Sequence, residues 1–463
     1  MPRFGRPGKY TVDGSPIGIR AAAIDSQPAR DLVTANEAGA DGPSLSMLFN
    51  RGSGSFFPEQ RVSVSTATDI LQAVAAGDFN ADGRGDVAIA IDDASTLPVH
   101  AAVLVYLNNG NNGFATPVRY PLTGFFPRCL EAADLNEDGA LDLVVCHSRS
   151  VGGSAEGLVT VLSGSRTGTV PNGSFQQTFS APVGTAPAGV GIGDVDADGH
   201  MDLVVVDPAE QRVLLLYGTT GTPAFASPVE LGTVDQPVAA LVNAVPDLPL
   251  PQVLVAATAG GKLLRYTQPT ARAFAAPVDQ RIALLPQAMA LADMDANGID
   301  DLVVVSALGA ELWYGEAAGT FRFGESISDD DSLDALTIAD LNNDDRLDIA
   351  ASGSSQDRVT VVLNGADVPF TPAPTATITQ TPTRTVPVPT ATRTPGGPVC
   401  AGDCSANGTV AVNELIQGVN IALGHFGVGT CPAFDRDGDG QVAVNELIAA
   451  VNSALIGCTG TAR

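Results

Sequence analysis

The sequence is poor in positive charge and in aromatic residues. Its 463 residues include 24 Lys and Arg against 51 Asp and Glu, a formal net charge of −27, and 5% are aromatic. An acidic chain of this kind repels phosphate backbones and anionic lipid surfaces, so nucleic acid is not expected as a partner and cations are favoured. Because no apolar run reaches the ~18 residues of a membrane helix, no membrane span is predicted.

Recognisable catalytic motifs are also missing. The sequence has no HExxH, GxSxG, P-loop or dinucleotide-binding fingerprint, and its four histidines are scattered. Paired carboxylates are frequent, but nearly all fall within repeated acidic loops, so no general acid and base can be singled out. The sequence therefore favours a non-catalytic protein and predicts no catalytic residue.

The N-terminal 18 residues lack the apolar core of a secretion signal.

The six cysteines contain no CxxC pair. Four of the six cysteines (400, 404, 431 and 458) gather near the C-terminus, which is typical of a disulfide-stapled module in an oxidising compartment. A clasp from 400 or 404 to 431 or 458 is expected there. Cys129 and Cys146 lie about equally far on either side of one acidic loop, which predicts a disulfide across a hairpin, with free buried thiols as the alternative. The cysteines thus indicate an extracellular or cell-surface location.

One segment recurs along most of the chain, with the form D-x-[DN]-x-[DN]-G-x-x-D followed by three apolar residues. It begins at Asp78, Asp134, Asp194, Asp293 and Asp340. A copy with a shortened loop is expected from Ala21, and another, in which prolines replace the acidic loop, over 238–260. Each repeat of ~50 residues contains about four short apolar strands. Seven such repeats predict a mainly β fold, a seven-bladed β-propeller over residues 10–368.

The blades must pack on one another, because one small sheet cannot bury its own faces. Phe114, Phe225, Phe274 and Phe321 are expected in that packing. The last repeat supplies roughly two strands before the composition changes. The N-terminal segment is therefore expected to add the missing outer strands and to close the ring, which removes exposed sheet edges.

The acidic loops offer the oxygen ligands that Ca²⁺ prefers. Asp or Asn at positions 1, 3, 5 and 9, a backbone carbonyl at position 7 and Gly at position 6 suit a cation with about 6 to 8 oxygen ligands. Metal-free turns are the alternative. In the fifth loop Asp345 replaces the Gly, which should weaken that site. The predicted ligands are Asp78, Asn80, Asp82, Arg84 and Asp86; Asp134, Asn136, Asp138, Ala140 and Asp142; Asp194, Asp196, Asp198, His200 and Asp202; Asp293, Asp295, Asn297, Ile299 and Asp301; and Asp340, Asn342, Asp344, Arg346 and Asp348.

The five loops and their flanking strands resemble FG-GAP or VCBS repeats, the blade unit of the integrin α-subunit propeller and of many bacterial extracellular proteins. The resemblance implies that each acidic loop is a calcium-binding hairpin that stabilises its blade. It also implies that the ring serves binding or adhesion rather than catalysis. The first and fifth repeats depart from the pattern and are expected to lack metal. The tripeptide Arg84-Gly85-Asp86, which looks like an adhesion ligand, is interpreted as the end of a metal loop.

Residues 369–399 form a Thr/Pro-rich linker that cannot bury a core and is predicted to be an extended spacer. Beyond it, "DCSANGTVAVNE" and "DRDGDGQVAVNE" match the 12-residue EF-hand loop, and each leads into an amphipathic helix. This duplication, over 400–458, resembles a dockerin domain, which implies a cohesin-like partner. The first loop has fewer carboxylates and should bind calcium more weakly. The predicted ligands are Asp403, Ser405, Asn407, Thr409 and Glu414, and Asp435, Asp437, Asp439, Gln441 and Glu446.

Taken together, these features predict a mainly β, secreted or cell-surface protein with a small α-helical C-terminal domain. Its propeller would bind an unknown protein or glycan ligand on one face, with the dockerin-like domain as a tether. Ca²⁺ is the expected cofactor, at about five propeller sites and one or two EF-hand-type sites. The alternatives are a secreted polysaccharide-active enzyme, a glycoside hydrolase or lyase, and a purely structural surface component.

Overall fold

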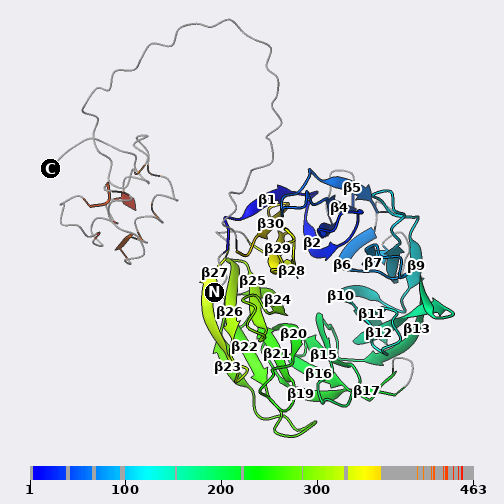
Figure 1. Cartoon of the computed structure of the whole chain (residues 1–463). Helices are drawn as coiled ribbons and strands as arrows, with labels where there is room; N and C mark the ends of the chain where they lie inside the picture. Colours follow the sequence, from blue (N-terminus) through cyan, green and yellow to red (C-terminus); the bar gives the residue numbers. More distant parts are fainter. Residues whose placement is uncertain are drawn as a thin grey trace, which may run out of the picture. The chain divides into compact units, whose positions relative to one another are not determined.

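The computed structural model describes residues 4–365, apart from 38–41, 65–68, 94–99, 152–153, 221–223, 284 and 328–331, and scattered positions between 404 and 451. The chain divides into two compact units, Met1–Thr377 and Ile378–Arg463. The first unit is a ring of seven four-stranded antiparallel sheets, which are its blades (Figure 1). The predicted seven-bladed β-propeller is therefore confirmed. Among the described residues, no helix is long and apolar enough to cross a membrane.

The first four blades follow one another in chain order. Blade 1 consists of β2 (Pro16–Ala22), β3 (Asp31–Asn36), β4 (Ser44–Leu48) and β5 (Gln60–Ser63). Blade 2 consists of β6 (Asp69–Gly77), β7 (Asp86–Asp93), β8 (His100–Tyr106) and β9 (Val118–Pro121). Blade 3 consists of β10 (Phe125–Ala133), β11 (Asp142–Val151), β12 (Ser154–Thr167) and β13 (Val170–Pro182). Blade 4 consists of β14 (Gly189–Gly193), β15 (Asp202–Asp207), β16 (Arg212–Leu216) and β19 (Val229–Thr233).

The remaining three blades complete the ring. Blade 5 consists of β20 (Pro237–Asn243), β21 (Gln252–Ala257), β22 (Lys262–Tyr266) and β23 (Val278–Arg281). Blade 6 consists of β24 (Pro286–Ala292), β25 (Asp301–Ser306), β26 (Gly309–Gly315) and β27 (Phe321–Ser326). Blade 7 consists of β28 (Ala335–Ala339), β29 (Asp348–Gly353), β30 (Arg358–Val362) and β1 (Gly8–Thr11). A two-stranded hairpin of β17 (Gly218–Thr219) and β18 (Ala224–Phe225) extends blade 4.

The ring closes in blade 7, where β1 pairs with β30 from Gly8 opposite Val361 to Thr11 opposite Arg358. Closure by the N-terminal segment is confirmed, but the expectation that it supplies more than one strand was wrong. The segment 335–339, which precedes the last acidic loop, is an apolar strand and forms the innermost strand of this blade. Only the outermost place remains for the N-terminus, and the following segment, 16–22, opens blade 1 instead.

The second strand of each blade is the most buried. In β15, Leu203, Val204, Val205 and Val206 are all 0% exposed, because the strand lies between two strands of its sheet and between two neighbouring blades. Continuous apolar runs are typical of strands covered on both faces. The expected packing role of the four phenylalanines is also confirmed. Phe321 is buried, and the other three, Phe114, Phe225 and Phe274, are partly buried against the hydrophobic clusters between blades.

Cys129 on β10 faces Cys146 on β11, and the two form a disulfide with 5.0 Å between their Cα atoms. This confirms the predicted pairing across the hairpin. In the second unit, Cys404 and Cys431 form another disulfide, beside a buried cluster of Ile421, Phe434, Val442 and Ala450. The predicted EF-hand ligands of this unit lie outside the described residues, apart from Asp435. Its calcium loops and its helical, dockerin-like nature therefore stay predictions, as does the Thr/Pro-rich linker.

His147 on β11 gives blade 3 a stability that depends on pH. Its side chain is 0% exposed, its Nε2 lies 2.8 Å from Thr160 Oγ1, and burial lowers its pKa to about 4. In the unfolded chain His147 binds a proton near pH 6.5, whereas in the folded chain it does so only near pH 4. We therefore expect this contribution to be complete above about pH 6.5 and to fall by about 3 kcal/mol as the pH drops to about 4.

The His147→Gln variant, which keeps a hydrogen-bonding group for Thr160, isolates this effect. The difference in free energy of unfolding between wild type and variant should shrink or reverse as the pH falls from 7 to 4. Denaturant unfolding at several pH values measures it, and a difference that stays constant over this range would contradict the assignment.

Candidate metal centres in the acidic loops

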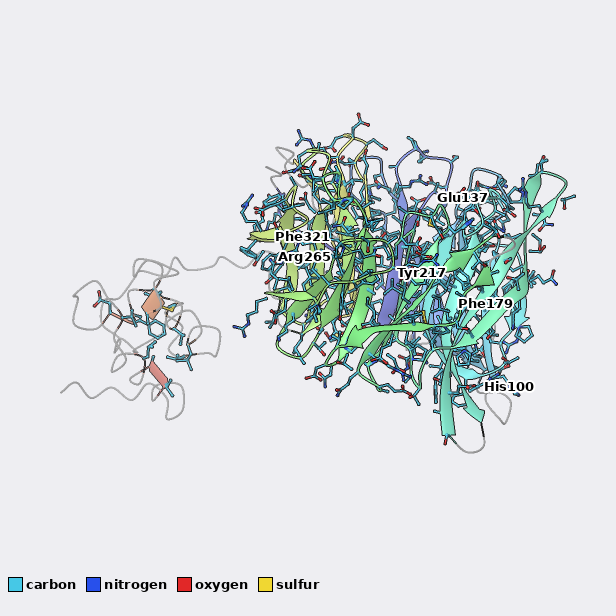
Figure 2. All side chains as sticks on the ribbon, turned by 90° about the horizontal axis from the view of Figure 1, so that it is seen from below. His100, Glu137, Phe179, Tyr217, Arg265 and Phe321 are labelled. Carbon is cyan, nitrogen blue, oxygen red and sulfur yellow. A yellow bond between two sulfur atoms is a disulfide. The ribbon has the colours of Figure 1, made fainter. Side chains whose placement is uncertain are left out.

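Each of the five acidic loops joins the innermost strand of a blade to its second strand. In blade 2, β6 ends at Gly77 and β7 begins at Asp86, the last residue of the loop. The corresponding strands of blades 3, 4, 6 and 7 begin at Asp142, Asp202, Asp301 and Asp348. Glu137 of the blade 3 loop and His100 at the start of β8 lie at opposite faces of the ring (Figure 2). We call the face with the acidic loops the loop face.

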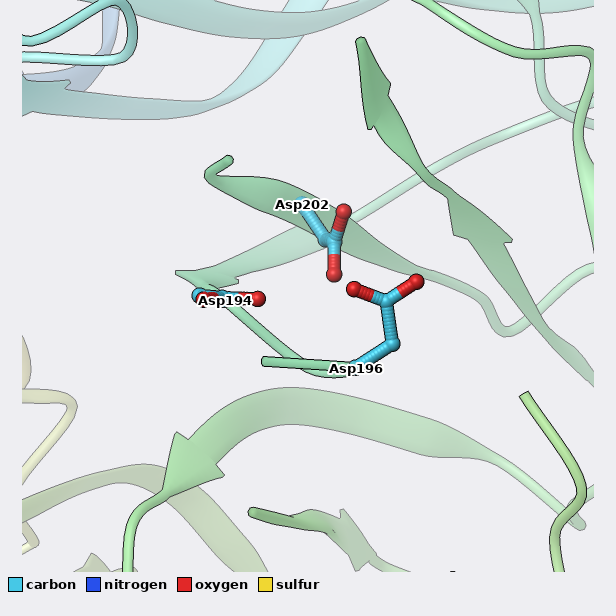
Figure 3. Close-up of side chains that lie close together, drawn as sticks. All are labelled: Asp194, Asp196 and Asp202. Carbon is cyan, nitrogen blue, oxygen red and sulfur yellow. The ribbon is translucent and has the colours of Figure 1, made fainter. Parts of the chain in front are cut away.

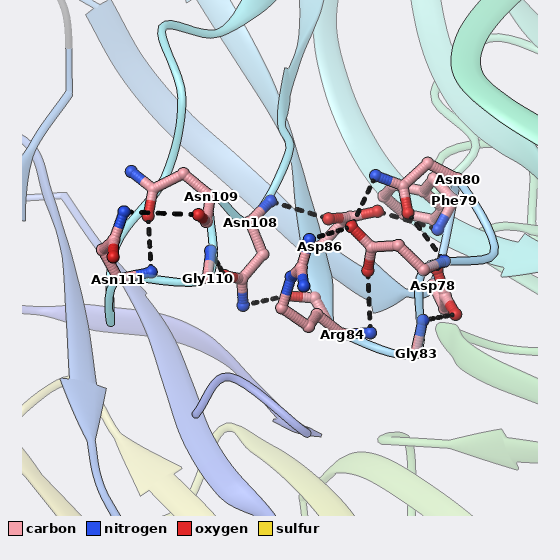
Figure 4. Close-up of polar contacts among 12 residues, drawn as sticks. Asp78, Phe79, Asn80, Gly83, Arg84, Asp86, Asn108, Asn109, Gly110 and Asn111 are labelled. Atoms are coloured by element: carbon pink, nitrogen blue, oxygen red, sulfur yellow. Dashed lines mark hydrogen bonds and ion pairs between the residues drawn. The ribbon is translucent and has the colours of Figure 1, made fainter. Parts of the chain in front are cut away.

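The position-1 aspartate holds the turn of each loop. In blade 2, Asp78 Oδ1 accepts a hydrogen bond from the backbone N–H of Asp82 at 3.0 Å, and Oδ2 accepts from Gly83 at 2.7 Å (Figure 4). Both bonds tie the carboxylate to its own loop. The same two bonds are made by Asp134, Asp194, Asp293 and Asp340.

The position-9 aspartate fastens the loop to its blade. Asp86 Oδ2 accepts from the backbone N–H of Phe79 at 2.9 Å, and Oδ1 accepts from that of Asn108, after the third strand, at 2.7 Å. Asp86 is 0% exposed, so the tripeptide Arg84-Gly85-Asp86 cannot present this carboxylate to an adhesion receptor. Equivalent pairs of bonds are made by Asp142, Asp202, Asp301 and Asp348.

Burial makes these position-9 carboxylates hard to ionise. Desolvation raises the pKa of Asp86, Asp142, Asp202 and Asp301 to about 6, and that of Asp348 to about 7. The backbone hydrogen bonds lower each pKa, and the neighbouring loop carboxylates raise it. A cation within about 4–6 Å would favour the ionised form and reverse the effect of burial.

Two of the loops each bring three carboxylates close together. Asp194, Asp196 and Asp202 in blade 4 (Figure 3), and Asp293, Asp295 and Asp301 in blade 6, each offer one oxygen within 4.8 Å of the others. Asp295 Oδ1 is buried and has no hydrogen-bond partner. An orphaned oxygen beside two further carboxylates fits a divalent cation with oxygen ligands, such as Ca²⁺, whose charge would offset their repulsion. In blades 2, 3 and 7 position 3 is an asparagine, and their loops form no such group of three acids.

The position-5 side chains turn toward their own backbone. Asp198 Oδ1 accepts from the N–H of His200 at 3.0 Å, and Asp198 is not part of the blade 4 carboxylate group. The equivalent bond recurs in the other four loops, made by Asp82, Asp138, Asn297 and Asp344. The structure thus brings positions 1, 3 and 9 together in blades 4 and 6 and leaves position 5 beside them. The metal-ligand roles, including the position-7 carbonyls, stay predictions.

Two loop positions need a left-handed backbone. The position-6 glycines have φ between 83° and 87°, and Asp345 takes their place in blade 7 with φ 61°. This conformation costs a residue with a side chain more free energy than it costs glycine, and the weaker fifth metal site stays a prediction. Position 4 is left-handed as well, from Ala81 in blade 2 to Asn343 in blade 7, and the sequence pattern did not reveal it because the alanine found there in three of the five loops does not signal positive φ.

Two segments of the chain, residues 24–89 and 293–351, match the FG-GAP-like repeat family. Both segments lie within the propeller, so two parts of the ring carry FG-GAP-like repeats. The chain is also similar to integrin alpha-4 of Xenopus laevis, with 27% identity over 146 residues. That stretch is 29% of this chain and 14% of integrin alpha-4, so the similarity concerns a small part of the relative.

The FG-GAP-like repeat of blade 1 corrects one expectation. Its loop is not shortened: the N–H of Ile24 bonds to Asp31 Oδ2, seven residues later, as Phe79 does to Asp86. The loop keeps its length and its buried aspartate, but Ala23 stands where the other loops have their first aspartate. The sequence pattern failed there because it relied on that residue. In blade 5, Gln252 replaces the aspartate and donates to Gly319 O at 3.0 Å.

Amide side chains connect the repeats around the ring. Asn108 Nδ2 in blade 2 donates to Ile24 O in the blade 1 loop at 2.7 Å, while its backbone N–H bonds to Asp86 of its own blade. Asn50, Asn364 and Gln268 make the same kind of bond to the loops of blades 7, 6 and 4. The loops of blades 1, 4, 6 and 7 are thereby coupled to the next blade. These amide residues were not predicted from the sequence, although the recurring Asn just after the third strand was a usable signal.

Proposed function

We propose that the protein is an extracellular, calcium-stabilised propeller that binds a protein or glycan ligand without catalysis. Its C-terminal module, dockerin-like in sequence, would tether it to a cohesin-like partner. The acidic loops would hold Ca²⁺ through positions 1, 3, 5 and 9 and the position-7 carbonyl. When bound, the cation supplies positive charge that offsets the repulsion between carboxylates.

The observation that carries the proposal is the repetition of one loop. Five copies with the same internal hydrogen bonds lie on one face of a ring in which two segments match FG-GAP-like repeats, and part of the chain is similar to integrin alpha-4. Copies at equivalent places are suited to stabilising a scaffold, whereas an active site needs one unique arrangement of groups. This supports a binding or adhesion module over an enzyme.

A hollow on the loop face is the most concrete place for a ligand. A cavity of about 470 Å³ lies between the loops of blades 1 and 2 and is lined by Asp25, Gln27, Arg30, Arg84 and Asn112. The blade 1 loop lacks the first aspartate. Two arginines, Arg30 and Arg84, line this part of the otherwise acidic face. Arg30 is exposed and forms no ion pair with another described residue, whereas Arg84 is paired with Asp82 of its own loop at 2.6 Å. A ligand with a carboxylate and hydroxyl groups, such as an acidic glycan, would complement these groups.

The full chain and an Arg30→Gln variant can be tested on an array of neutral and uronate-containing glycans, in millimolar calcium and in EDTA. We expect saturable binding of wild type to uronate-containing glycans in calcium, at least about tenfold weaker binding by the variant, and weaker binding in EDTA. A reducing-sugar assay on the bound glycans should detect no release. Sugar release would favour the polysaccharide-active enzyme, and absence of any glycan binding would contradict the glycan-binding proposal.

A further inference from the structure

Arg272 lies on the acidic loop of a neighbouring blade. It belongs to the turn between β22 and β23 of blade 5, yet its Nε donates to Asp196 Oδ2 in the blade 4 loop. Its Nη2 lies 3.0 Å from Asp198 Oδ2, and its guanidinium carbon lies 4.4 Å from the ring centre of Tyr217. Asp196 is only 5% exposed. A buried carboxylate of the blade 4 loop therefore already has a cationic partner.

The turn that carries Arg272 is fixed to blade 4. Gln268, which is 4% exposed, donates from Nε2 to Val195 O at 2.7 Å and accepts at Oε1 from the N–H of Arg272 at 2.9 Å. Arg272 has φ 63°, in the left-handed region that residues with a side chain rarely adopt. The contacts with blade 4 offset this unfavourable backbone conformation.

Blade 6 provides an internal comparison. Its loop forms the same group of three carboxylates, and Tyr314 occupies the place of Tyr217: each directly follows the residue that pairs with the first residue after the position-9 aspartate. Arg322 stacks on Tyr314 with 5.1 Å between the guanidinium carbon and the ring centre, but its ion-pair partner is Glu316 rather than a loop carboxylate. Asp295, the counterpart of Asp196, keeps one buried oxygen without a hydrogen-bond partner. The arginine contact thus distinguishes two otherwise similar loops.

We propose that Arg272 is a built-in competitor for the cation of the blade 4 loop, which therefore binds calcium more weakly than it would without the arginine. Without metal, the guanidinium neutralises Asp196 and Asp198. A divalent cation must displace it or bind beside a positive charge, and either lowers the affinity. Because the same turn is anchored to blade 4, displacement of Arg272 would also couple metal binding to the contact between blades 4 and 5. The inference rests on the proposed function in one respect, calcium binding by the acidic loops.

Two tyrosines allow each loop to be monitored separately. Tyr217 and Tyr314 lie beside the blade 4 and blade 6 loops, so tyrosine-sensitised luminescence of Tb³⁺, a hard cation that takes oxygen ligands like Ca²⁺, should report on both. The probe is Tb³⁺ alone, titrated into the full chain with and without Tyr217→Phe or Tyr314→Phe. The signal lost with each substitution gives the saturation curve of the corresponding loop.

We expect Arg272→Gln to increase the Tb³⁺ affinity of the blade 4 loop about tenfold, since two charge-assisted contacts no longer compete. Arg272→Lys, which keeps the charge, should stay within about twofold of wild type. The matched control Arg322→Gln should change neither loop, and the blade 6 curve should be the same in all variants. Because the Arg272 side chain is 51% exposed, its substitution should leave the fold intact, and melting curves in EDTA check this.

If the blade 4 loop of Arg272→Gln bound Tb³⁺ as tightly as wild type or more weakly, the inference would be overturned. If the blade 6 loop still saturates in that experiment, the calcium proposal stands and only the role of Arg272 is lost. If neither loop binds Tb³⁺, and Ca²⁺ titration changes no signal, both proposals fail.

Discussion

Excess EDTA should lower the melting temperature of the full-length protein by at least about 10 °C relative to millimolar calcium. A ligand at 100 times its dissociation constant adds about 2.7 kcal/mol per site, and about 1 kcal/mol moves the melting temperature of a large domain by about 2–4 °C. The physical reason is the repulsion between loop carboxylates, which lie closest in blades 4 and 6; in blade 4, Asp194, Asp196 and Asp202 place oxygens within 4.8 Å of one another. Calorimetry or circular dichroism at fixed ionic strength measures the shift.

The same scan in potassium chloride of equal ionic strength is the control, because general screening would act on all 51 acidic residues and not on the loops alone. Potassium should restore little of the melting temperature that calcium restores. Equal melting temperatures in EDTA and calcium would contradict a stabilising role for the metal.

Asp31→Ala should destabilise the propeller by about 3–5 kcal/mol, to the same extent with and without calcium. The Asp31 carboxylate is 0% exposed and accepts from three backbone N–H groups, those of Ile24, Asp25 and Asn50. Alanine would leave these donors unpaired in the interior. Asp31→Asn, which keeps one acceptor oxygen, should cost less. Denaturant unfolding in EDTA and in calcium measures each loss.

Asp301→Ala is the matched variant in a loop with the full acidic pattern. Asp301 is equally buried and makes the equivalent bonds to Met294 and Gly315. In EDTA we expect the two alanine variants to lose similar stability. In calcium, Asp301→Ala should lose more, because a predicted metal ligand is removed as well. If Asp31→Ala and Asp301→Ala lost equal stability both in EDTA and in calcium, the position-9 aspartates would have a purely structural role.

The sequence predicted the ring and the five loops because each loop needs particular residues at fixed positions. A glycine, or Asp345 in its place, must adopt positive φ, and Asp86 and its counterparts must satisfy two backbone donors at the start of a buried strand. Those requirements act within about thirty residues, so they leave a periodic pattern. Four short strands per repeat and a buried second strand follow from the same local pattern.

Contacts between blades were not predictable from the same pattern. Arg272 and Asp196 are 76 positions apart, and Gln268 and Val195 are 73 apart, so nothing local joins them. The blade 1 loop was misread for a related reason: Ala23 changes the predicted chemistry while the hydrogen bonds of Asp31 keep the geometry. The innermost strand of blade 7 was not predicted, because the strands of the last repeat were counted only after its acidic loop and this strand precedes the loop.

A crystal structure of the full-length protein grown in millimolar calcium tests the central claim most directly. We predict a calcium ion in each of the acidic loops of blades 2, 3, 4, 6 and 7, held by positions 1, 3, 5 and 9 and the position-7 carbonyl. The loops of blades 1 and 5 should hold none, since Ala23 and Gln252 remove ligands there. Acidic loops that bind only water under these conditions would contradict the claim.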